Sequence, residues 1–136
     1  MGGVDEKRAK EIFAGIGLVK HLGVELRRVD ADSAEMSFVV AEKHGNYLGG
    51  LHGGAIAAVM DTVVFFPGRL LPSGRKLTTE GIEVHFFRPV SMGERVTVRA
   101  QIMRLGRRVC TVEAKASDPS GKEIASAVVT LLDLEA

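Results

Sequence analysis

The residues with the clearest chemical potential lie in a short stretch that joins a glycine-rich turn to a single acidic side chain. His52-Gly53-Gly54 precedes Asp61 by seven residues, and the segment between them is apolar. The first N–H groups of a helix lack internal partners and carry partial positive charge, so a helix that begins here can polarise a carbonyl oxygen. A carboxylate two turns later can act as a general base or as a nucleophile. Together these groups predict an oxyanion hole beside a reactive carboxylate.

The segment from Ala55 to Phe66 must position these groups, and its length and alanine content favour a helix over a buried strand. At about 100° per residue, one face is an apolar stripe suited to packing on a sheet: Ile56, Val59, Met60 and Val63. The other face carries small residues around one acid: Gly54, Ala57, Ala58, Asp61 and Phe65. A lone Asp in a helix more often faces solvent or caps a loop. The glycines before it are what favour the catalytic interpretation.

The rest of the chain predicts one further helix, which precedes the central helix, and six strands that surround it. Asp5 to Leu18 has helical spacing, within an N-terminal helical segment of residues 1–22. The expected strands are bounded by turn residues: Val24 to Asp30, Ala34 to Val40, Leu77 to Pro89, Arg95 to Arg104, Arg108 to Ser117, and Glu123 to Asp133. This order predicts a single α+β domain over residues 1–136. The sheet would leave one face of the helix partly bare, so we expect a second subunit to cover it.

Composition argues against several other classes of protein. The net charge of +1, from 18 basic and 17 acidic residues, provides no general field for nucleic acid or anionic membrane. No apolar run approaches the roughly 20 residues of a membrane span, and residues 1–10 do not resemble a signal peptide. The single cysteine, Cys110, suits a reducing cytoplasm. The four histidines lack the spacing of metal ligands, so we expect no metal and no separate cofactor.

Four segments of the chain resemble the hotdog-fold acyl-CoA thioesterases of the phenylacetate-pathway type. The most specific is Asn46-Tyr47-Leu48-Gly49-Gly50-Leu51-His52-Gly53-Gly54 followed by Asp61. The segment Thr78 to Pro89 resembles the strand that follows the central helix in that family. Gly93-Glu94 and the hairpin Arg104 to Arg108 also fit, so the resemblance covers residues 23–134.

The resemblance implies a hotdog fold, in which a mostly antiparallel sheet wraps one long central helix. It also implies dimers, often tetramers, with active sites at the dimer interface and acyl-CoA as substrate. Within the site, Asp61 activates water or attacks the thioester carbonyl itself. The backbone N–H of Gly53 polarises that carbonyl, Asn46 helps to position it, and a hydroxyl from the partner subunit, by spacing Thr79, orients the water.

Two features of this chain depart from the family pattern. The water-orienting residue is often Ser, whereas this chain offers Thr78 and Thr79. Thr79 does not share the strand face of Ile82, unless a bulge at Gly81 re-aims it; otherwise Thr78 serves instead. The second departure is Pro67, which is expected to shorten or kink the central helix and so reshape the acyl pocket.

Other residues are candidates for contacts with the substrate. His52 and Gly54 flank the predicted oxyanion hole, although His52 is better explained as a brace for its loop. The phosphates of coenzyme A need cations, and the candidates are Arg88, Arg104, Arg107 and Arg108. Two alternatives stay open: a hotdog hydratase or dehydratase that uses a histidine with Asp61, and a non-catalytic acyl-CoA sensor. Release of free thiol separates hydrolysis from hydration.

Overall fold

The computed structural model of the chain describes residues 4–136. Its helices are α1 (Glu6–Ala14), α2 (Gly17–His21) and α3 (Gly53–Val63), and two short 3-10 turns are η1 (Glu42–His44) and η2 (Leu71–Ser73). Its strands are β1 (Glu25–Val29), β2 (Ser33–Val39), β3 (Leu77–Phe86), β4 (Arg95–Leu105), β5 (Val109–Ser117) and β6 (Glu123–Asp133). All six expected strands are therefore present, although β3 ends three residues before Pro89.

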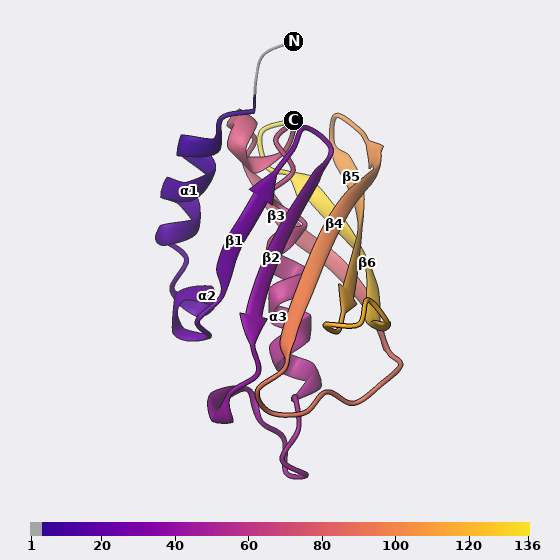
Figure 1. Ribbon diagram of the computed structural model, residues 1–136. Coiled ribbons are helices and arrows are strands. Elements are labelled where there is room, and N and C mark those ends of the chain that lie inside the picture. The colour runs from indigo at the N-terminus through magenta and orange to yellow at the C-terminus, as the bar shows by residue number, and fades with distance from the viewer. Residues whose placement is uncertain (1–3) are drawn as a thin grey trace.

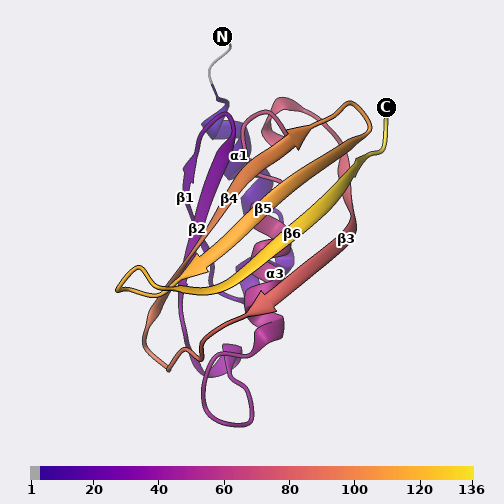
Figure 2. The ribbon, with the colours of Figure 1, turned by 90° about the vertical axis from the view of Figure 1, so that its right-hand side faces the viewer.

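The six strands form one antiparallel sheet in the order β1-β2-β4-β5-β6-β3. Helix α3 lies against one face of this sheet, and α1 and α2 lie beside β1 (Figures 1 and 2). The buried side chains of α3 are those of the predicted apolar stripe: Ile56, Val59, Met60 and Val63. Alternate residues of the strands face them, as the period of two in a β-strand requires. The predicted α+β class, an antiparallel sheet with a helix packed on one face, is confirmed.

The central helix is shorter than the sequence predicted, because it ends at Val63 instead of Phe66. Pro67 explains this end, since proline has no N–H to donate and disfavours a helical conformation in the residue before it. The N–H groups of Phe65 and Phe66 each donate to the carbonyl three residues earlier, which tightens the last turn. The chain then folds back, and the N–H of Leu71 donates to the Phe65 carbonyl at 3.0 Å. This return places η2 beside the end of α3.

The N-terminal segment forms two helices where the sequence predicted one from Asp5 to Leu18. Helix α1 ends at Ala14 with Gly15 as its C-cap, and Ile16 has an extended backbone with φ −87° and ψ 102°. The segment is attached to the core, because the rings of Phe13 and Phe66 pack edge to face with centroids 5.9 Å apart. The break at Gly15 therefore changes the direction of the chain without detaching it from the domain.

The two edges of the sheet differ in their exposure to further pairing. Strand β1 has five residues and an irregular register between Leu26 and Arg28, and helices lie beside it (Figure 1). Strand β3 has ten residues and pairs only with β6 among residues 4–136. Such an edge presents unpaired N–H and C=O groups to which another strand can bond. Strand β3 is thus the available edge of this sheet.

A partly buried arginine holds the hairpin between β4 and β5. Arg75 Nε donates to Asp133 Oδ2 at 2.8 Å, and its Nη2 donates to the carbonyls of Gly106 and Arg107 at 2.9 and 2.8 Å. The backbone N–H of Glu135 and the Arg75 guanidinium hold the pKa of Asp133 below its usual range. The hairpin that carries three candidate arginines therefore has a defined position relative to the start of β3.

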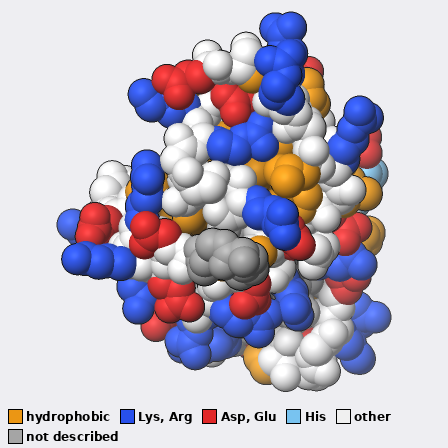
Figure 3. Space-filling view, turned by 90° about the horizontal axis from the view of Figure 1, so that it is seen from above, with side chains coloured by type: hydrophobic (Ala, Val, Ile, Leu, Met, Phe, Trp, Pro, Cys, Tyr) orange, Lys and Arg blue, Asp and Glu red, His pale blue; other side chains and the backbone are white. Residues whose placement is uncertain are grey.

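The end of the molecule that carries this hairpin has a mixed surface. Lys and Arg side chains are interspersed with Asp and Glu side chains there (Figure 3). Several of them form exposed ion pairs, such as Arg28 with Asp30 and Arg69 with Asp32, both at 2.9 Å.

Within residues 4–136, no helix combines the length and the hydropathy that crossing a membrane requires.

Candidate active site

Asp61, the predicted acid, and Thr79, the predicted hydroxyl residue, are joined by a hydrogen bond. Asp61 lies in the second half of α3 and is half-buried, and Thr79 lies near the start of β3. Thr79 Oγ1 donates a hydrogen bond of 2.7 Å to Asp61 Oδ1. A hydrogen bond to an ionised acceptor is about twice as strong as a neutral one. No other described side chain or backbone group bonds to Asp61 Oδ2, so this oxygen is available to a water or a substrate.

A bulge in β3 aims the Thr79 side chain at Asp61. The register of β3 against β6 shifts between Thr79 and Gly81, as the sequence predicted if Thr79 were to be used. Thr79 therefore pairs with Leu131 and Ile82 with Val129, which are both buried, so Thr79 and Ile82 lie on the same face of the sheet. Thr78 is exposed. The bulge thus brings Thr79, and not Thr78, to the carboxylate. The hydroxyl comes from the same chain as Asp61, which differs from the expectation that a partner subunit supplies it.

The start of α3 leaves one backbone donor free. His52 caps the helix, because its Nδ1 accepts a hydrogen bond of 2.7 Å from the N–H of Gly54. The His52 carbonyl accepts from the N–H of Ala55 at 3.0 Å. The N–H of Gly53 makes no hydrogen bond within residues 4–136. His52 therefore braces this turn as expected, and it engages the Gly54 donor while leaving the Gly53 donor for a ligand.

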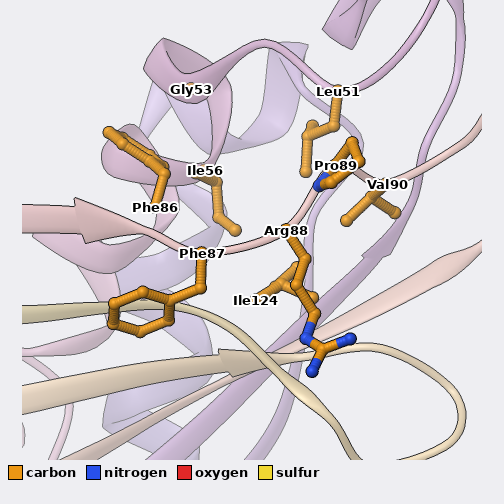
Figure 4. Close-up of a pocket in the computed structure, with 9 residues that line it drawn as sticks. All are labelled: Leu51, Gly53, Ile56, Phe86, Phe87, Arg88, Pro89, Val90 and Ile124. Atoms are coloured by element: carbon orange, nitrogen blue, oxygen red, sulfur yellow. The ribbon is translucent and has the colours of Figure 1, made fainter.

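A cavity of about 440 Å³ opens at the Gly53 end of α3. The ring of Phe86 covers Gly53 so closely that a Cβ on this glycine would lie 3.2 Å from the nearest ring atom. Figure 4 shows Phe86 beside Gly53, with Leu51 and Ile56 also on the cavity wall. The guanidinium of Arg88 extends away from Gly53 (Figure 4). The wall of this cavity is therefore mainly apolar and also includes Gly53, whose N–H makes no described hydrogen bond, and the cationic Arg88.

The Asn46 side chain organises the loop before α3. Its Oδ1 accepts from the N–H groups of Leu48 and Gly50 at 2.9 and 3.0 Å. Its Nδ2 donates to the Leu51 carbonyl at 3.3 Å. One amide hydrogen of Asn46 is left, because an amide NH₂ has two donors. Asn46 thus holds the loop that leads into the Gly53 turn.

His44 is a residue of this loop whose role the sequence did not reveal. It is 3% exposed, its Nδ1 accepts from the N–H of Ala41 at 2.9 Å, and its Nε2 lies 2.6 Å from the Leu22 carbonyl. Since Nδ1 accepts, Nε2 carries the hydrogen and donates it. The His44 carbonyl also accepts from the N–H of His52 at 2.7 Å. In the sequence, the only sign of a role for His44 is its position two residues before Asn46. Such a position does not reveal whether the His44 side chain is buried.

A second cavity, of about 500 Å³, contains the Asp61–Thr79 pair. Thr62 and Thr78 also lie on its wall. The rest of the wall is apolar and comes from four separate segments of the chain: Ile16, Phe65 with Phe66, Leu71, and Leu77. The carboxylate therefore faces a space that can hold an apolar group.

Within one chain, the free donor and the carboxylate are too far apart to act on one carbonyl group. Gly53 and Asp61 are eight residues apart on α3, which corresponds to about 12 Å at 1.5 Å per residue. The same separation keeps His52 away from Asp61, so a histidine–aspartate pair for hydration does not form in one chain. No group of three or more His, Cys, Asp or Glu side chains suited to a metal ion occurs within residues 4–136.

The four candidate arginines lie at two ends of the sheet. Arg88 lines the cavity at Gly53, beyond the end of β3. Arg104, Arg107 and Arg108 are exposed on the β4–β5 hairpin, at the end where β3 starts. Each group of arginines therefore lies near a different half of the predicted site.

Comparisons with known proteins agree on one family. The family model of the Thioesterase superfamily matches residues 48–125. The proofreading thioesterase EntH of Cronobacter turicensis is 33% identical over 106 residues, which are 77% of this chain and 77% of EntH. Alignments with the curated relatives span between 66% and 89% of the relatives' lengths.

Solved structures share the same fold. The E. coli PaaI protein from the phenylacetic acid degradation operon has a TM-score of 0.88 at 19% identity, with 96% of both chains covered. The smu.793 protein of Streptococcus mutans, solved bound to acetyl-CoA, has a TM-score of 0.76 at 18% identity, with 81% of this chain and 87% of that chain covered. These likenesses confirm the hotdog arrangement of sheet and helix.

Proposed function

This chain belongs to the Thioesterase superfamily, and we propose that it hydrolyses acyl-CoA thioesters to a free acid and coenzyme A. The observation that carries the proposal is the 2.7 Å hydrogen bond from Thr79 to Asp61 beside an apolar cavity. Hydrolysis of a thioester needs a nucleophile and the stabilisation of one oxyanion. The chain offers a carboxylate for the first requirement and the free N–H of Gly53 for the second.

Asp61 acts on the carbonyl carbon through the oxygen that Thr79 leaves free. As a general base, it removes a proton from water, and the water oxygen bonds to the carbonyl carbon. As a nucleophile, Oδ2 itself bonds to that carbon, and water then hydrolyses the mixed anhydride. In both cases the C–S bond breaks and the coenzyme A thiolate takes up a proton. Thr79 keeps the carboxylate in a fixed orientation by donating to Oδ1.

A second copy of the chain completes the site, because Gly53 lies about 12 Å from Asp61 within one copy. The uncovered edge of β3 is where that copy pairs. Antiparallel pairing of two β3 strands about a two-fold axis at their middle sets Thr79 of one chain near the partner's Phe86. Since Phe86 covers Gly53, the partner's Gly53 N–H then approaches the carbonyl that Asp61 attacks. Asn46 supports this half by holding its loop and by offering its remaining amide hydrogen.

The same pairing gathers the arginines around the mouth of each site. Arg88 of the partner subunit approaches the end of the sheet that carries Arg107 and Arg108. Phosphates of coenzyme A bind such clusters, since arginine donates to phosphate in a bidentate geometry. The acetyl-CoA bound by smu.793 supports coenzyme A as the carrier. Two such dimers would give the expected tetramer, and a buried Cys110 suits the reducing cytoplasm.

The test is thiol release from a panel of short, medium, long and aryl acyl-CoAs by the wild type, Asp61→Asn and Asp61→Ala. Both substitutions are expected to lower kcat on the order of a hundredfold or more. Enoyl absorbance is followed in the same reactions, because its change without thiol release would identify a hydratase. Full thiol release by both variants would refute the assignment of Asp61.

A further inference from the structure

The wall of the Asp61 cavity carries one acidic side chain and no cation among the described residues, which disfavours acyl groups with a negative charge. Asp61 is the only charged side chain among the described residues that line it, and Thr79 already donates its hydroxyl hydrogen to Asp61. The Thr62 hydroxyl is also occupied, because its Oγ1 donates to the Ala58 carbonyl at 2.8 Å. The described residues of this wall include no cation, and the Thr78 hydroxyl is the one side-chain donor among them that is not already engaged. An acyl group with a terminal carboxylate would therefore be desolvated beside Asp61 without a cation to pair with.

One part of the cavity wall is supplied by the N-terminal segment. Ile16 lies at the break between α1 and α2, where its extended backbone departs from the helical path. Ile16 lines the cavity, together with Leu71 from η2 and residues of α3 and β3. Ile12, one turn earlier on α1, also packs against the core but does not line the cavity. The break in the helix thus gives Ile16 a position that Ile12 does not share.

This wall is held firmly in place. Before Ile16 in the chain, Phe13 packs edge to face on Phe66, and after it Val19 is fully buried. The Leu22 carbonyl at the end of α2 accepts a hydrogen bond of 2.6 Å from His44 Nε2. Leu71 is held by the bond from its N–H to the Phe65 carbonyl. A wall fixed on both sides of Ile16 limits the length of a bound group.

We propose that this cavity takes the acyl group as an uncharged apolar chain, and that Ile16, as part of its apolar wall, limits the acyl length. The proposal rests on the proposed function, because it assigns the acyl group of the thioester to the Asp61 cavity. It makes Ile16 a specificity-determining residue outside the catalytic machinery. Each methylene that a hydrophobic pocket accepts or rejects changes kcat/KM by about 10-fold to 200-fold.

The experiment measures kcat/KM by thiol release over saturated acyl-CoAs from about four to about sixteen carbons. Ile16→Ala is expected to move the optimum about two carbons toward longer chains, since it removes three side-chain carbons from the wall. Ile16→Phe is expected to move it toward shorter chains. Ile12→Ala is the matched control, because it deletes the same atoms from the same segment without altering the cavity. Ile16→Val provides a smaller shift in the same direction should Ile16→Ala fail to fold.

Charge is tested on the wild type with succinyl-CoA and butyryl-CoA, which have the same number of acyl carbons. We expect kcat/KM for succinyl-CoA to be lower on the order of a hundredfold. An unchanged length profile in the Ile16 variants, or equal rates with the two esters, overturns the inference while the hydrolase itself stands. The proposed function has a separate test, because thiol release that survives in Asp61→Asn would refute the assignment of Asp61.

Discussion

Thr79 Oγ1 donates to Asp61 Oδ1 at 2.7 Å, across the gap between the start of β3 and the end of α3. The bond exists because a bulge between Thr79 and Gly81 turns the threonine toward the helix. It fixes one carboxylate oxygen and leaves the other to react. The hydroxyl of Thr79 thereby holds the half-buried carboxylate in one orientation at the cavity wall.

Removal of the Thr79 hydroxyl should reduce catalysis more than binding. Thr79→Val keeps the shape of the side chain and is expected to lower kcat about tenfold to a hundredfold, with little change in KM. Thr79→Ser retains the donor and should stay within a few-fold of the wild type. Steady-state kinetics on one acyl-CoA decides the matter. Equal kcat values for the valine and serine variants would show that the hydroxyl has no part in the reaction.

The Gly53 N–H can be deleted almost alone. Gly53 is the first helical residue, where proline is well tolerated, and His52 before it has the extended backbone that proline prefers. Gly53→Pro is expected to lower kcat about 100-fold to 1,000-fold, as the loss of one oxyanion donor does. Gly53→Ala adds the same Cβ against Phe86 but keeps the N–H, so it reports the steric effect separately. The prediction fails if the two variants lose activity equally.

Mixing two inactive variants tests whether the site is shared between chains. Asp61→Asn and Gly53→Pro are unfolded together, refolded together and assayed for thiol release. A mixed two-fold dimer has one site with an intact Asp61 and an intact Gly53, so about a quarter of the wild-type activity should return. Each variant refolded alone is the control. Activity no higher than the controls, with a dimer seen by light scattering, would place both groups in one chain.

Arg88 and Arg107 are expected to strengthen binding of the coenzyme A part of the substrate and to have no effect on binding of the acyl group. Arg88→Ala and Arg107→Ala are expected to raise KM several-fold for an acyl-CoA and to leave KM for the matching acyl-pantetheine unchanged. Arg27→Ala, an exposed arginine on β1, is the control for general charge loss. Added salt should weaken the interaction with the CoA ester only. Parallel effects on both esters would remove the arginines from the phosphate site.

Much of this molecule follows from local patterns in the sequence. The apolar stripe of α3 and the positions of the six strands follow from side-chain periodicity, which depends on residues a few positions apart. The positions of Gly53 and Asp61 on one helix also follow, and with them the distance of about 12 Å that separates them in a single chain. The end of that helix near Pro67 is also a local effect, because proline has no N–H to donate and disfavours a helical conformation in the residue before it.

Other features depend on contacts between distant segments, and only the tertiary structure decided them. The pairing of β3 with β6, its bulge and its uncovered edge determine that Thr79 faces Asp61. The break at Gly15 and the fold-back of η2 bring Ile16 and Leu71 to one cavity. A shift of one residue in register turns a side chain to the opposite face of a sheet, and periodicity carries no information about which strand lies next to which. For that reason the sequence identified Asp61, whereas the fold selected its partners.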